Sequence, residues 1–206
     1  MDLRGYACFL RSSGIAQLRT SPPWFVWSSG QQSPIYLDHR RLLGYPTWRR
    51  WVVEELHRLI LQQGVEPRGV VGVATGGIPW AAWLGERLGL PVGYVRPQPK
   101  PHGYGQQVEG LRPSAAPVLI VEDVLSTGQS LHRATQALAQ SGYAVGAAFV
   151  LWSYELPQLP SFSFPLYRLL TFPQALLFWE MEGLITQQDK AMLLSWIRGG
   201  PSGKLG

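Results

Sequence analysis

The sequence has little of what marks disulfide-stapled, metal-clustered, disordered or membrane proteins. It contains one cysteine among 206 residues, which excludes an intrachain disulfide framework and a cysteine-based metal cluster. Charged residues make up only 15% of the chain and hydrophobic residues 46%, a balance that excludes an intrinsically disordered polymer. No apolar run is long enough to span a bilayer, and the first residues lack the apolar core of a signal peptide. We therefore expect a folded cytoplasmic protein with no membrane partner.

Runs of basic residues are also missing. The formal net charge is +5 and the sequence pI is about 9.6, but the lysines and arginines are scattered. Nucleic-acid-binding arms concentrate such residues, so we expect no nucleic-acid partner and attribute the excess charge to a polyanionic small substrate or a basic surface. The chain also lacks a Gly-x-Gly-x-x-Gly sequence after a strand pattern and a Walker lysine, which disfavours dinucleotide and nucleoside-triphosphate sites.

What the sequence does contain is a strand, loop and helix pattern in its second half. Four apolar residues from Val118 predict a buried parallel strand, whose exposed end carries Glu122 and Asp123. Residues 126–130 (Ser-Thr-Gly-Gln-Ser) then offer hydroxyls, a flexible glycine and backbone N–H groups, and a helical pattern follows as far as Gly142. Unpaired N–H groups and the helix dipole converge at such a turn, so the pattern predicts an anion site.

The two carboxylates restrict which anion fits this site. They would repel a bare phosphate, so the ligand should also carry hydroxyl groups or a metal on that side. A ribose 5-phosphate meets this requirement, because its hydroxyls can donate to Glu122 and Asp123 while its phosphate occupies the loop. The alternative is an ordinary strand-to-helix turn with an acidic cap. The strand, acid pair, hydroxyl loop and helix in register favour the ligand site.

A second loop of the same kind follows an apolar strand pattern at residues 70–74. It begins with Thr75, Gly76 and Gly77 and leads into a helical pattern that starts with proline. Two glycines at a strand end let backbone amides approach a ligand closely. An ordinary turn between strand and helix is the alternative for this loop considered alone.

A third loop follows the strand pattern at residues 91–95. Its prolines and glycines, spread over residues 96–110, preclude a helix or a central strand. A long loop inside a compact domain is usually either functional or disordered. This one carries three cations close together, Arg96, Lys100 and His102, which favours a functional loop.

Strand and helix patterns alternate along the rest of the chain. Residues 24–37 predict a hairpin around a Ser-Gly turn, and residues 153–165 are proline-rich and irregular. Helices are expected within the first 23 residues and at 47–63, 79–89, 131–142, 173–182 and 186–198, and a further strand at 144–151. This alternation predicts an α/β fold with a mostly parallel sheet and helices on both faces. The three loops should meet beyond the carboxyl ends of the strands.

Three separate motifs together resemble the orotate phosphoribosyltransferases, a family of type I phosphoribosyltransferases. The acid pair and hydroxyl loop at residues 122–130 resemble the family's motif for 5-phosphoribosyl 1-diphosphate (PRPP). The aromatic strand, Ser-Gly turn and Ser-Pro-x-Tyr-x-Asp sequence at residues 24–38 resemble its N-terminal signature. The arginine, lysine, His-Gly and Glu-Gly spacing at residues 96–110 resembles its catalytic loop. The resemblance spans residues 24–130.

The resemblance implies transfer of the phosphoribosyl group of PRPP to orotate, giving orotidine 5′-monophosphate and diphosphate in de novo pyrimidine synthesis. It implies a type I phosphoribosyltransferase-like core at residues 47–206, including the C-terminal helices, and a small N-terminal hood at residues 1–46, within a single compact unit. Mg²⁺ would be held mainly by the substrate, with no protein metal site. The family also implies a homodimer in which the loop at residues 96–110 acts across subunits.

The motifs also imply roles for individual residues. The implied catalytic residues are Arg96, Lys100, His102 and Asp123. The implied PRPP-binding residues are Thr75, Gly76, Gly77, Glu122, Asp123, Val124, Leu125, Ser126, Thr127, Gly128, Gln129 and Ser130. The implied base-binding residues are Ser28, Ser29, Gly30 and Ser126.

Three positions differ from the family's usual residues. Ser28 stands where a lysine usually precedes the Ser-Gly turn, and Pro97 stands where a lysine often follows the loop arginine. Residues 152–153 (Trp-Ser) stand where an Asp-Arg pair is common. With fewer cations near the base, the orotate carboxylate would rely on backbone N–H groups of the turn, or on Arg40 or Arg41. We therefore expect orotate to bind more weakly than in relatives that keep the lysine.

Two other functions remain open at this stage. One is a phosphoribosyltransferase that acts on another base, and the other is a non-catalytic PRPP-sensing regulatory protein. Lys100 and His102 favour an enzyme, because a sensor needs no cations to stabilise a leaving group.

Overall fold

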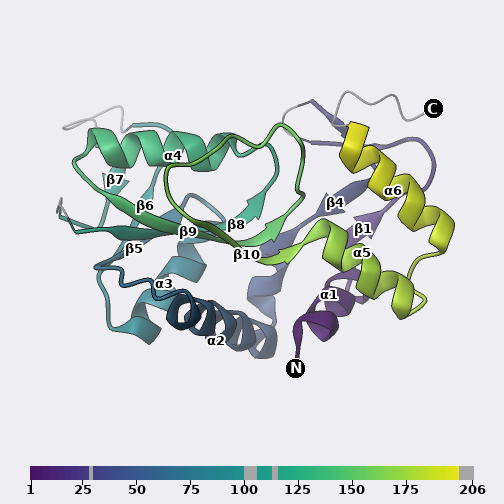
Figure 1. Ribbon diagram of the computed structural model, residues 1–206, viewed down its shortest axis with the longest axis horizontal. Helices are drawn as coiled ribbons and strands as arrows, with labels where there is room; N and C mark the ends of the chain where they lie inside the picture. Colours follow the sequence, from purple (N-terminus) through teal and green to yellow (C-terminus); the bar gives the residue numbers. More distant parts are fainter. Residues whose placement is uncertain (28–29, 100–105, 113–115, 200–206) are drawn as a thin grey trace.

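The computed structural model describes residues 1–27, 30–99, 106–112 and 116–199, and it is built around a six-stranded sheet (Figure 1). The strands, in spatial order, are β10 (Leu166–Thr171), β9 (Val145–Ser153), β8 (Val118–Leu125), β5 (Val70–Val73), β6 (Val92–Val95) and β7 (Val108–Glu109). Neighbouring strands are parallel except for β6 and β7, which are antiparallel. The predicted α/β class with a mostly parallel sheet is confirmed.

Helices cover both faces of the sheet. The helices α2 (Pro46–Gln62) and α3 (Gly77–Leu88) lie on one face, and α4 (Gln129–Gln140) lies on the other (Figure 1). Alternate residues of β8 enter the two resulting cores, since Leu119 packs on the α2–α3 side and Ile120 on the α4 side. A strand that is buried on both faces must be apolar throughout, which explains the unbroken apolar runs in the sequence.

Strand β8 is longer than the sequence predicts, and it contains both carboxylates. Its apolar run ends at Val121, but the strand continues to Leu125. Pairing with β5 stops at Val121, opposite Gly72, whereas pairing with β9 continues to Leu125, opposite Ser153. The partner strand β9 therefore extends β8 past the point where its own sequence becomes polar. Beyond Val121, β8 is therefore no longer paired with β5. After these two strands the chain continues to opposite faces of the sheet, into α3 and α4. Ligands of such sheets usually bind at this position.

The N-terminal segment forms two small sheets of its own. After helix α1 (Leu3–Ser12), strand β1 (Ala16–Leu18) pairs antiparallel with β4 (Ile35–Leu37). Between them, β2 (Phe25–Val26) and β3 (Gln32–Ser33) form the predicted hairpin. A 3₁₀ helix, η1 (His39–Gly44), then leads into α2.

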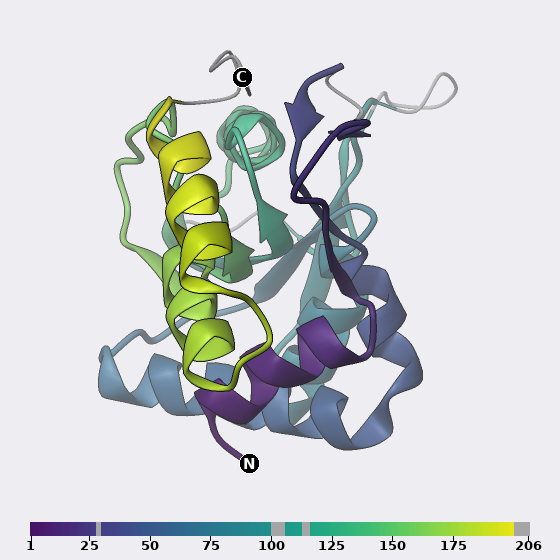
Figure 2. The ribbon, with the colours of Figure 1, turned by 90° about the vertical axis from the view of Figure 1, so that its right-hand side faces the viewer.

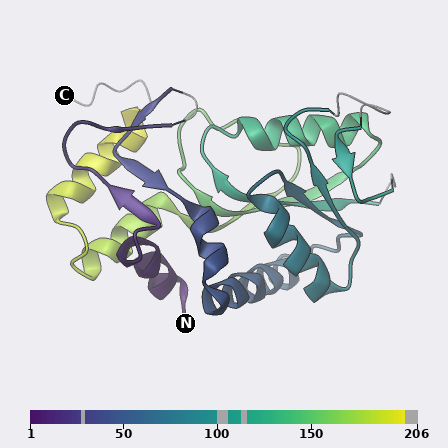
Figure 3. The same ribbon diagram turned by 180° about the vertical axis from the view of Figure 1, so that it is seen from behind.

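The N-terminal segment packs beside the C-terminal helices α5 (Phe172–Met181) and α6 (Gln187–Gly199), as Figures 2 and 3 show. The indole Nε1 of Trp179 on α5 donates a hydrogen bond of 2.7 Å to the carbonyl of Ala7 on α1. Residues from both ends of the chain belong to one hydrophobic cluster that continues onto the sheet. Across the described ranges, no helix combines the length and apolarity that crossing a membrane requires.

Some elements differ from those predicted. The strand β10 was not predicted, and β9 extends to Ser153 rather than ending at Leu151. A capping box starts α6, because the Thr186 hydroxyl accepts from the Asp189 N–H at 3.1 Å while the Asp189 carboxylate accepts from the Thr186 N–H at 2.9 Å. Residues 154–165 contain no helix or strand, as their prolines predict.

Candidate active site

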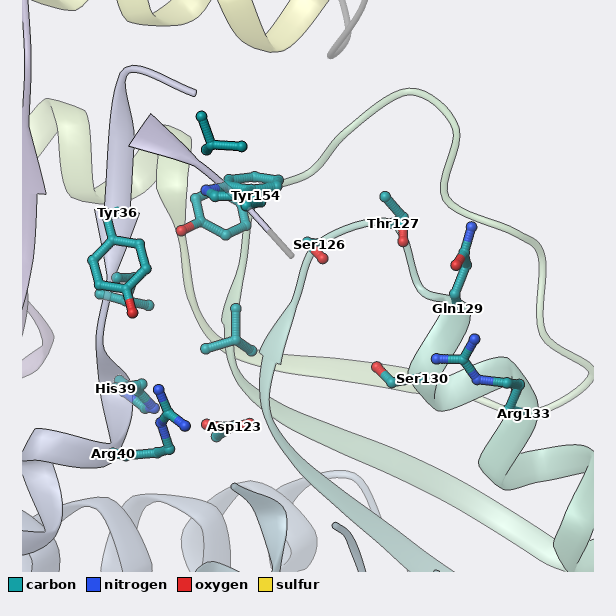
Figure 4. A pocket seen from close by; sticks show the side chains of 14 residues that line it. Tyr36, His39, Arg40, Asp123, Ser126, Thr127, Gln129, Ser130, Arg133 and Tyr154 are labelled. Atoms are coloured by element: carbon teal, nitrogen blue, oxygen red, sulfur yellow. The ribbon is translucent and has the colours of Figure 1, made fainter. Parts of the chain in front are cut away.

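A cavity of about 720 Å³ lies at the carboxyl end of β8, between α4 and the N-terminal segment (Figure 4). Its wall combines residues from five parts of the chain, which are the β2 hairpin, β4 with η1, β8, the turn into α4, and the residue after β9. The residues that line it are Val26, Trp27, Tyr36, Leu37, His39, Arg40, Asp123, Val124, Ser126, Thr127, Gln129, Ser130, Arg133 and Tyr154.

One end of the cavity is formed by the hydroxyl loop at residues 126–130. Its side chains Ser126, Thr127, Gln129 and Ser130 all line the cavity. Helix α4 begins at Gln129 without a side-chain cap, so the N–H groups of its first turn are available to an anion. Hydroxyl groups and unpaired helix N–H groups at this end of the cavity could donate to an anion.

Position 128 of the loop requires a glycine. Its φ of +76° lies in the left-handed region, and a Cβ there would come within 2.7 Å of Cδ of Pro160. Gly128 and Leu125 do not line the cavity, and the side chain of Leu125 is buried in the core on the α4 side. Any contact between these two residues and a ligand would therefore be made by backbone atoms.

The two neighbouring carboxylates point to opposite faces of β8, as adjacent strand residues must. Asp123 lines the cavity, whereas Glu122 is only 4% exposed and does not. The prediction that both carboxylates are exposed at the strand end is therefore wrong for Glu122. The cause is the extension of β8, which places Glu122 inside the sheet and under α4.

Glu122 is held by the helix above it. The Ser130 hydroxyl donates to Oε1 of Glu122, and Oε2 has no hydrogen-bond partner among the described residues. Burial raises the pKa of Glu122 from its ordinary value of 4.5 to about 8, although the Ser130 hydrogen bond and the charge of Arg133 act in the opposite direction. With this pKa, Glu122 is largely protonated at neutral pH in the unliganded protein.

Asp123 lies against the loop that follows β5. Burial raises its pKa, while backbone N–H groups of Asp123 and Val124 and the charge of Arg40 act in the opposite direction. A Cβ on Gly76 would overlap the Asp123 carboxylate, and a Cβ on Gly77 would overlap the backbone of β8. The glycines therefore allow the start of α3 to approach β8 and its carboxylate. Neither glycine lines the cavity, nor does Thr75.

The other end of the cavity is aromatic. Trp27, Tyr36 and Tyr154 line it, and the ring centroids of Trp27 and Tyr154 are 4.8 Å apart. Tyr154 is 3% exposed, and its backbone N–H donates to the carbonyl of Leu125 at 3.0 Å, which holds it beside the end of β8. Such a surface suits a planar ring. Figure 4 shows Ser126 between this end of the cavity and the rest of the hydroxyl loop.

Among the residues predicted to bind the base, Ser126 lies at the cavity. Ser28 and Ser29 lie outside the described residues, and Gly30 is exposed with φ of +81° and does not line the cavity. Ser153, which stands at the family's usual Asp-Arg pair, is completely buried. Tyr154, the next residue, reaches the cavity and was not predicted.

Arg40 and Arg41 were alternative cations for the orotate carboxylate, and only one of the two lies at the cavity. Arg40 lines the cavity, on the side of Asp123 (Figure 4). Arg41 instead donates from Nη1 to the carbonyl of Gly14 at 3.0 Å and does not line the cavity. Of the two, Arg40 is the cation that can reach a ligand.

The third predicted loop is only partly described. Arg96 follows β6 directly, and its backbone N–H donates to the carbonyl of Gln107 at 2.9 Å, so the two ends of the loop lie side by side. Nη1 of Arg96 is 4.0 Å from Oε1 of Glu109. Lys100 and His102 lie outside the described residues.

Arg96 borders a smaller cavity of about 70 Å³, together with Ser130 and Arg133 of α4. Arg133 was not predicted as a site residue. Its signal in the sequence is its spacing, since it lies four residues after Gln129 and therefore on the same face of the helix.

Comparison with known proteins agrees with this geometry. A family model described as a phosphoribosyl transferase domain matches residues 51–158. The orotate phosphoribosyltransferase of Halalkalibacterium halodurans is 39% identical over 189 residues, which are 90% of this chain and 89% of that protein. The orotate phosphoribosyltransferase of Cutibacterium acnes is 39% identical over 176 residues, 84% of this chain and 82% of that protein.

Solved structures give the same family. The crystal structure of orotate phosphoribosyltransferase from Aeropyrum pernix superposes with a TM-score of 0.73 at 36% identity, covering 87% of this chain and 99% of that chain. A structure of Leishmania donovani UMP synthase has a TM-score of 0.80 at 24% identity and covers 96% of this chain and 42% of that one, a likeness of fold. The chain therefore belongs to the orotate phosphoribosyltransferases, within the phosphoribosyltransferase family.

Proposed function

We propose that this enzyme transfers the phosphoribosyl group of PRPP to orotate, forming orotidine 5′-monophosphate and diphosphate in pyrimidine synthesis. The observation that carries the proposal is the arrangement of one cavity, with a hydroxyl loop and helix start at one end and an aromatic surface at the other. Asp123 lines the same cavity beside Arg40 (Figure 4), and we assign it to the ribose of a bound nucleotide.

In this reaction, the bond between the anomeric carbon and the diphosphate breaks as the bond to a ring nitrogen of orotate forms. The anomeric carbon gains positive charge and the leaving diphosphate gains negative charge. The protein must hold the ribose and neutralise the leaving group, and preorganised charges contribute about a hundredfold or more each to such steps.

We assign the ribose phosphate to the residues around α4. The 5′-phosphate would accept hydrogen bonds from the loop at residues 126–130 and from the first N–H groups of α4. Asp123 would accept a hydrogen bond from a ribose hydroxyl. Glu122 does not line the cavity, so its assignment to the ribose stays a prediction from the family motif.

We assign binding of the diphosphate to the loop at residues 96–110. Arg96, Lys100 and His102 are assigned to it by resemblance to the family, and of these the structure describes Arg96. Closure of such a loop excludes water and brings cations onto the leaving group. A homodimer in which this loop enters the partner's site, and a cytoplasmic location, stay predictions.

The cavity fits a magnesium ion that is held mainly by substrate. Among the described residues, no group of three or more His, Cys, Asp or Glu side chains could hold a metal, and Asp123 is the carboxylate on the cavity wall. Mg²⁺ commonly binds through one or two carboxylates plus substrate phosphates and water. When bound, the ion would neutralise charge on the diphosphate.

The base would lie between Tyr36 and Tyr154, with Ser126 beside it. Arg40 lies in η1, lines the cavity, and has its Nε 3.4 Å from Oδ1 of Asp38. We assign it to the orotate carboxylate, because Ser28 replaces the lysine that the family usually places near the base.

The proposal is tested by incubating the protein with PRPP, Mg²⁺ and orotate, while the loss of orotate absorbance and the release of diphosphate are followed together. We expect both signals with the wild type. The Asp123→Asn variant should keep its melting temperature but bind PRPP at least tenfold more weakly in calorimetric titration, because hydrogen bonds to charged groups are worth about 1.5–3 kcal/mol.

Three results would contradict parts of this account. Diphosphate release with another base but not with orotate would make the protein a phosphoribosyltransferase for that base. PRPP binding without turnover of any base would make it a regulatory protein. Unchanged PRPP affinity in Asp123→Asn would remove Asp123 from the ribose site.

A further inference from the structure

Arg133 is the one arginine of α4, which has no lysine, and its side chain turns back toward the hydroxyl loop. Gln129 lies one helical turn before Arg133 and on the same face of the helix. Long side chains in helices point toward the N-terminus, so the guanidinium of Arg133 reaches over the turn that begins α4. Figure 4 shows it beside Gln129 and Ser130, facing the cavity.

The cavities around α4 place this guanidinium at their junction. Arg133 lines the 720 Å³ cavity together with Thr127, and it lines the 70 Å³ cavity together with Arg96. It also borders a third cavity of about 410 Å³ on the outer side of the loop, with His132 and Gln158. Arg133 is therefore within reach of a ligand that enters the loop from any of these sides.

No carboxylate holds Arg133 away from the cavity. In the part of the chain that the structure describes, Arg133 forms no ion pair, whereas Arg58, Arg87 and Arg168 each pair with a glutamate. The long-range charge of Arg133 acts on buried Glu122, which Ser130 separates from the cavity. Its hydrogen-bonding groups remain available to a ligand.

The charge balance of the loop requires a cation there. The side chains of Ser126, Thr127, Gln129 and Ser130 are neutral, and Asp123 adds potential negative charge beside them. A bound 5′-phosphate carries up to two negative charges. An arginine matches a phosphate better than a lysine would, because its planar guanidinium can donate two parallel hydrogen bonds.

We propose that Arg133 binds the 5′-phosphate of PRPP and of the nucleotide product, closing the hydroxyl loop from the α4 side. The inference rests on the proposed function, since it assigns a further residue to the same site. The shared chemistry is a phosphate group, and PRPP carries phosphate at two places. Orotidine 5′-monophosphate carries only the 5′-phosphate, and inorganic diphosphate represents only the leaving group, so the two ligands separate the possibilities.

The test compares wild type with Arg133→Gln in titrations with orotidine 5′-monophosphate and, separately, with inorganic diphosphate and Mg²⁺. We expect the affinity for the nucleotide to fall roughly tenfold or more, which is the usual loss for a charged hydrogen bond, and the affinity for diphosphate to change by less than twofold. Arg133→Lys should recover part of the loss. The KM for PRPP should rise while kcat stays near the wild-type value, because the contact is made equally in the ground state.

Arg50→Gln is the matched control. Arg50 is an exposed arginine on α2, on the opposite face of the sheet, so its loss changes the net charge equally without touching the loop. It should leave both affinities unchanged. The melting temperatures of both variants are measured first, so that loss of the fold is not mistaken for loss of a contact.

Two results would overturn the proposal. Unchanged nucleotide affinity in Arg133→Gln would show that Arg133 is an ordinary surface charge. Equal losses for nucleotide and diphosphate, or a loss for diphosphate alone, would move Arg133 to the leaving group. If the wild type itself does not turn over orotate with PRPP, the proposed function is wrong. That result differs from a failure of the Arg133 assignment, which is seen only in the comparison of the variant with the wild type.

Discussion

The hydroxyl of Ser130, in the first turn of α4, donates to Oε1 of Glu122 on the strand beneath it. This contact joins the predicted phosphate loop to a carboxyl that the sequence places at the exposed end of β8. Because the other oxygen of Glu122 is buried without a partner among the described residues, the protonated form of this carboxyl is favoured. The protonation state of Glu122 therefore links the stability of the unliganded protein to pH.

The first prediction follows from the pKa of Glu122, which burial raises from 4.5 to about 8. Between these pH values the folded protein keeps a proton that the unfolded chain has released. Unfolding then releases a proton, so the contribution of Glu122 to stability falls as pH rises through this window. Glu122→Gln should be more stable than wild type at pH 9, by up to a few kcal/mol, and its stability should depend less on pH.

Urea denaturation at pH 6 and pH 9 measures this effect. Glu66→Gln is the matched control, because Glu66 is exposed and the same change of charge should leave the pH dependence as in wild type. A Glu122→Gln protein with the wild-type pH dependence would show that Glu122 is ionised in the folded state.

A second prediction concerns the close approach of Gly76 to Asp123. In Gly76→Ala, the added methyl group would overlap the Asp123 carboxylate and force it away from its position. We expect a loss of about 1–3 kcal/mol in the free energy of unfolding, as for overpacked cores, and weaker PRPP binding because Asp123 is displaced. Chemical denaturation and calorimetric titration measure the two effects.

Gly44→Ala is the companion to that variant. A Cβ on Gly44 has no atom within 4 Å, and Gly44 ends η1 in an exposed position. It should change neither stability nor PRPP affinity appreciably. If Gly76→Ala behaves like Gly44→Ala, the loop after β5 adapts and does not position Asp123.

A third prediction concerns the orotate carboxylate. If Arg40 binds it, Arg40→Gln should raise the KM for orotate roughly tenfold or more, since a charged hydrogen bond is lost. Any residual turnover of uracil, which has no carboxylate, should be unaffected. Ser28→Lys should act in the opposite direction and lower the KM for orotate, because it restores the lysine usual in the family.

Arg41→Gln controls for the charge of the neighbouring arginine. Arg41 is held by the carbonyl of Gly14 and does not line the cavity, so its loss should spare the KM for orotate. Equal effects of the two substitutions would indicate a general electrostatic contribution rather than a contact of Arg40.

The fourth prediction concerns Lys100 and the dimer. Lys100→Ala should lower kcat more than it weakens PRPP binding, because the lysine would act on charge that develops in the transition state. Mixing Lys100→Ala subunits with Asp123→Asn subunits should restore activity if the loop acts in the partner's site. An inactive mixture, with subunit exchange verified, would mean that each loop serves its own subunit.

The sequence predicts the centre of the fold better than its edges. Residues 70–73 and 118–121 are buried throughout, which explains why these two runs are apolar without a break. Strand β10 was not predicted because it lies at the edge of the sheet, where its residues are mostly half-buried and form no continuous apolar run. The burial of Glu122 could not be read from the sequence either, because pairing with β9 extends β8 into a polar stretch.

The site divides in the same way. The hydroxyl loop is contiguous, so its position after the strand follows from residues 126–130 alone. The aromatic end is assembled from Trp27 and Tyr36, which are near each other in the chain, and from Tyr154, which is far from both and meets them only in the fold. The position of Arg133 is predicted in part. Helical spacing gives the face of α4 on which it lies, but not the cavity beside that face.

The most direct test of the central claim is a competition experiment with the wild-type protein. PRPP and Mg²⁺ are supplied with equal concentrations of orotate, uracil, adenine and hypoxanthine, and the nucleotides formed are identified by mass spectrometry. We predict that orotidine 5′-monophosphate is the dominant product and forms in equal amount to the diphosphate released. Dominance of any other nucleotide, or consumption of no base at all, would contradict the account.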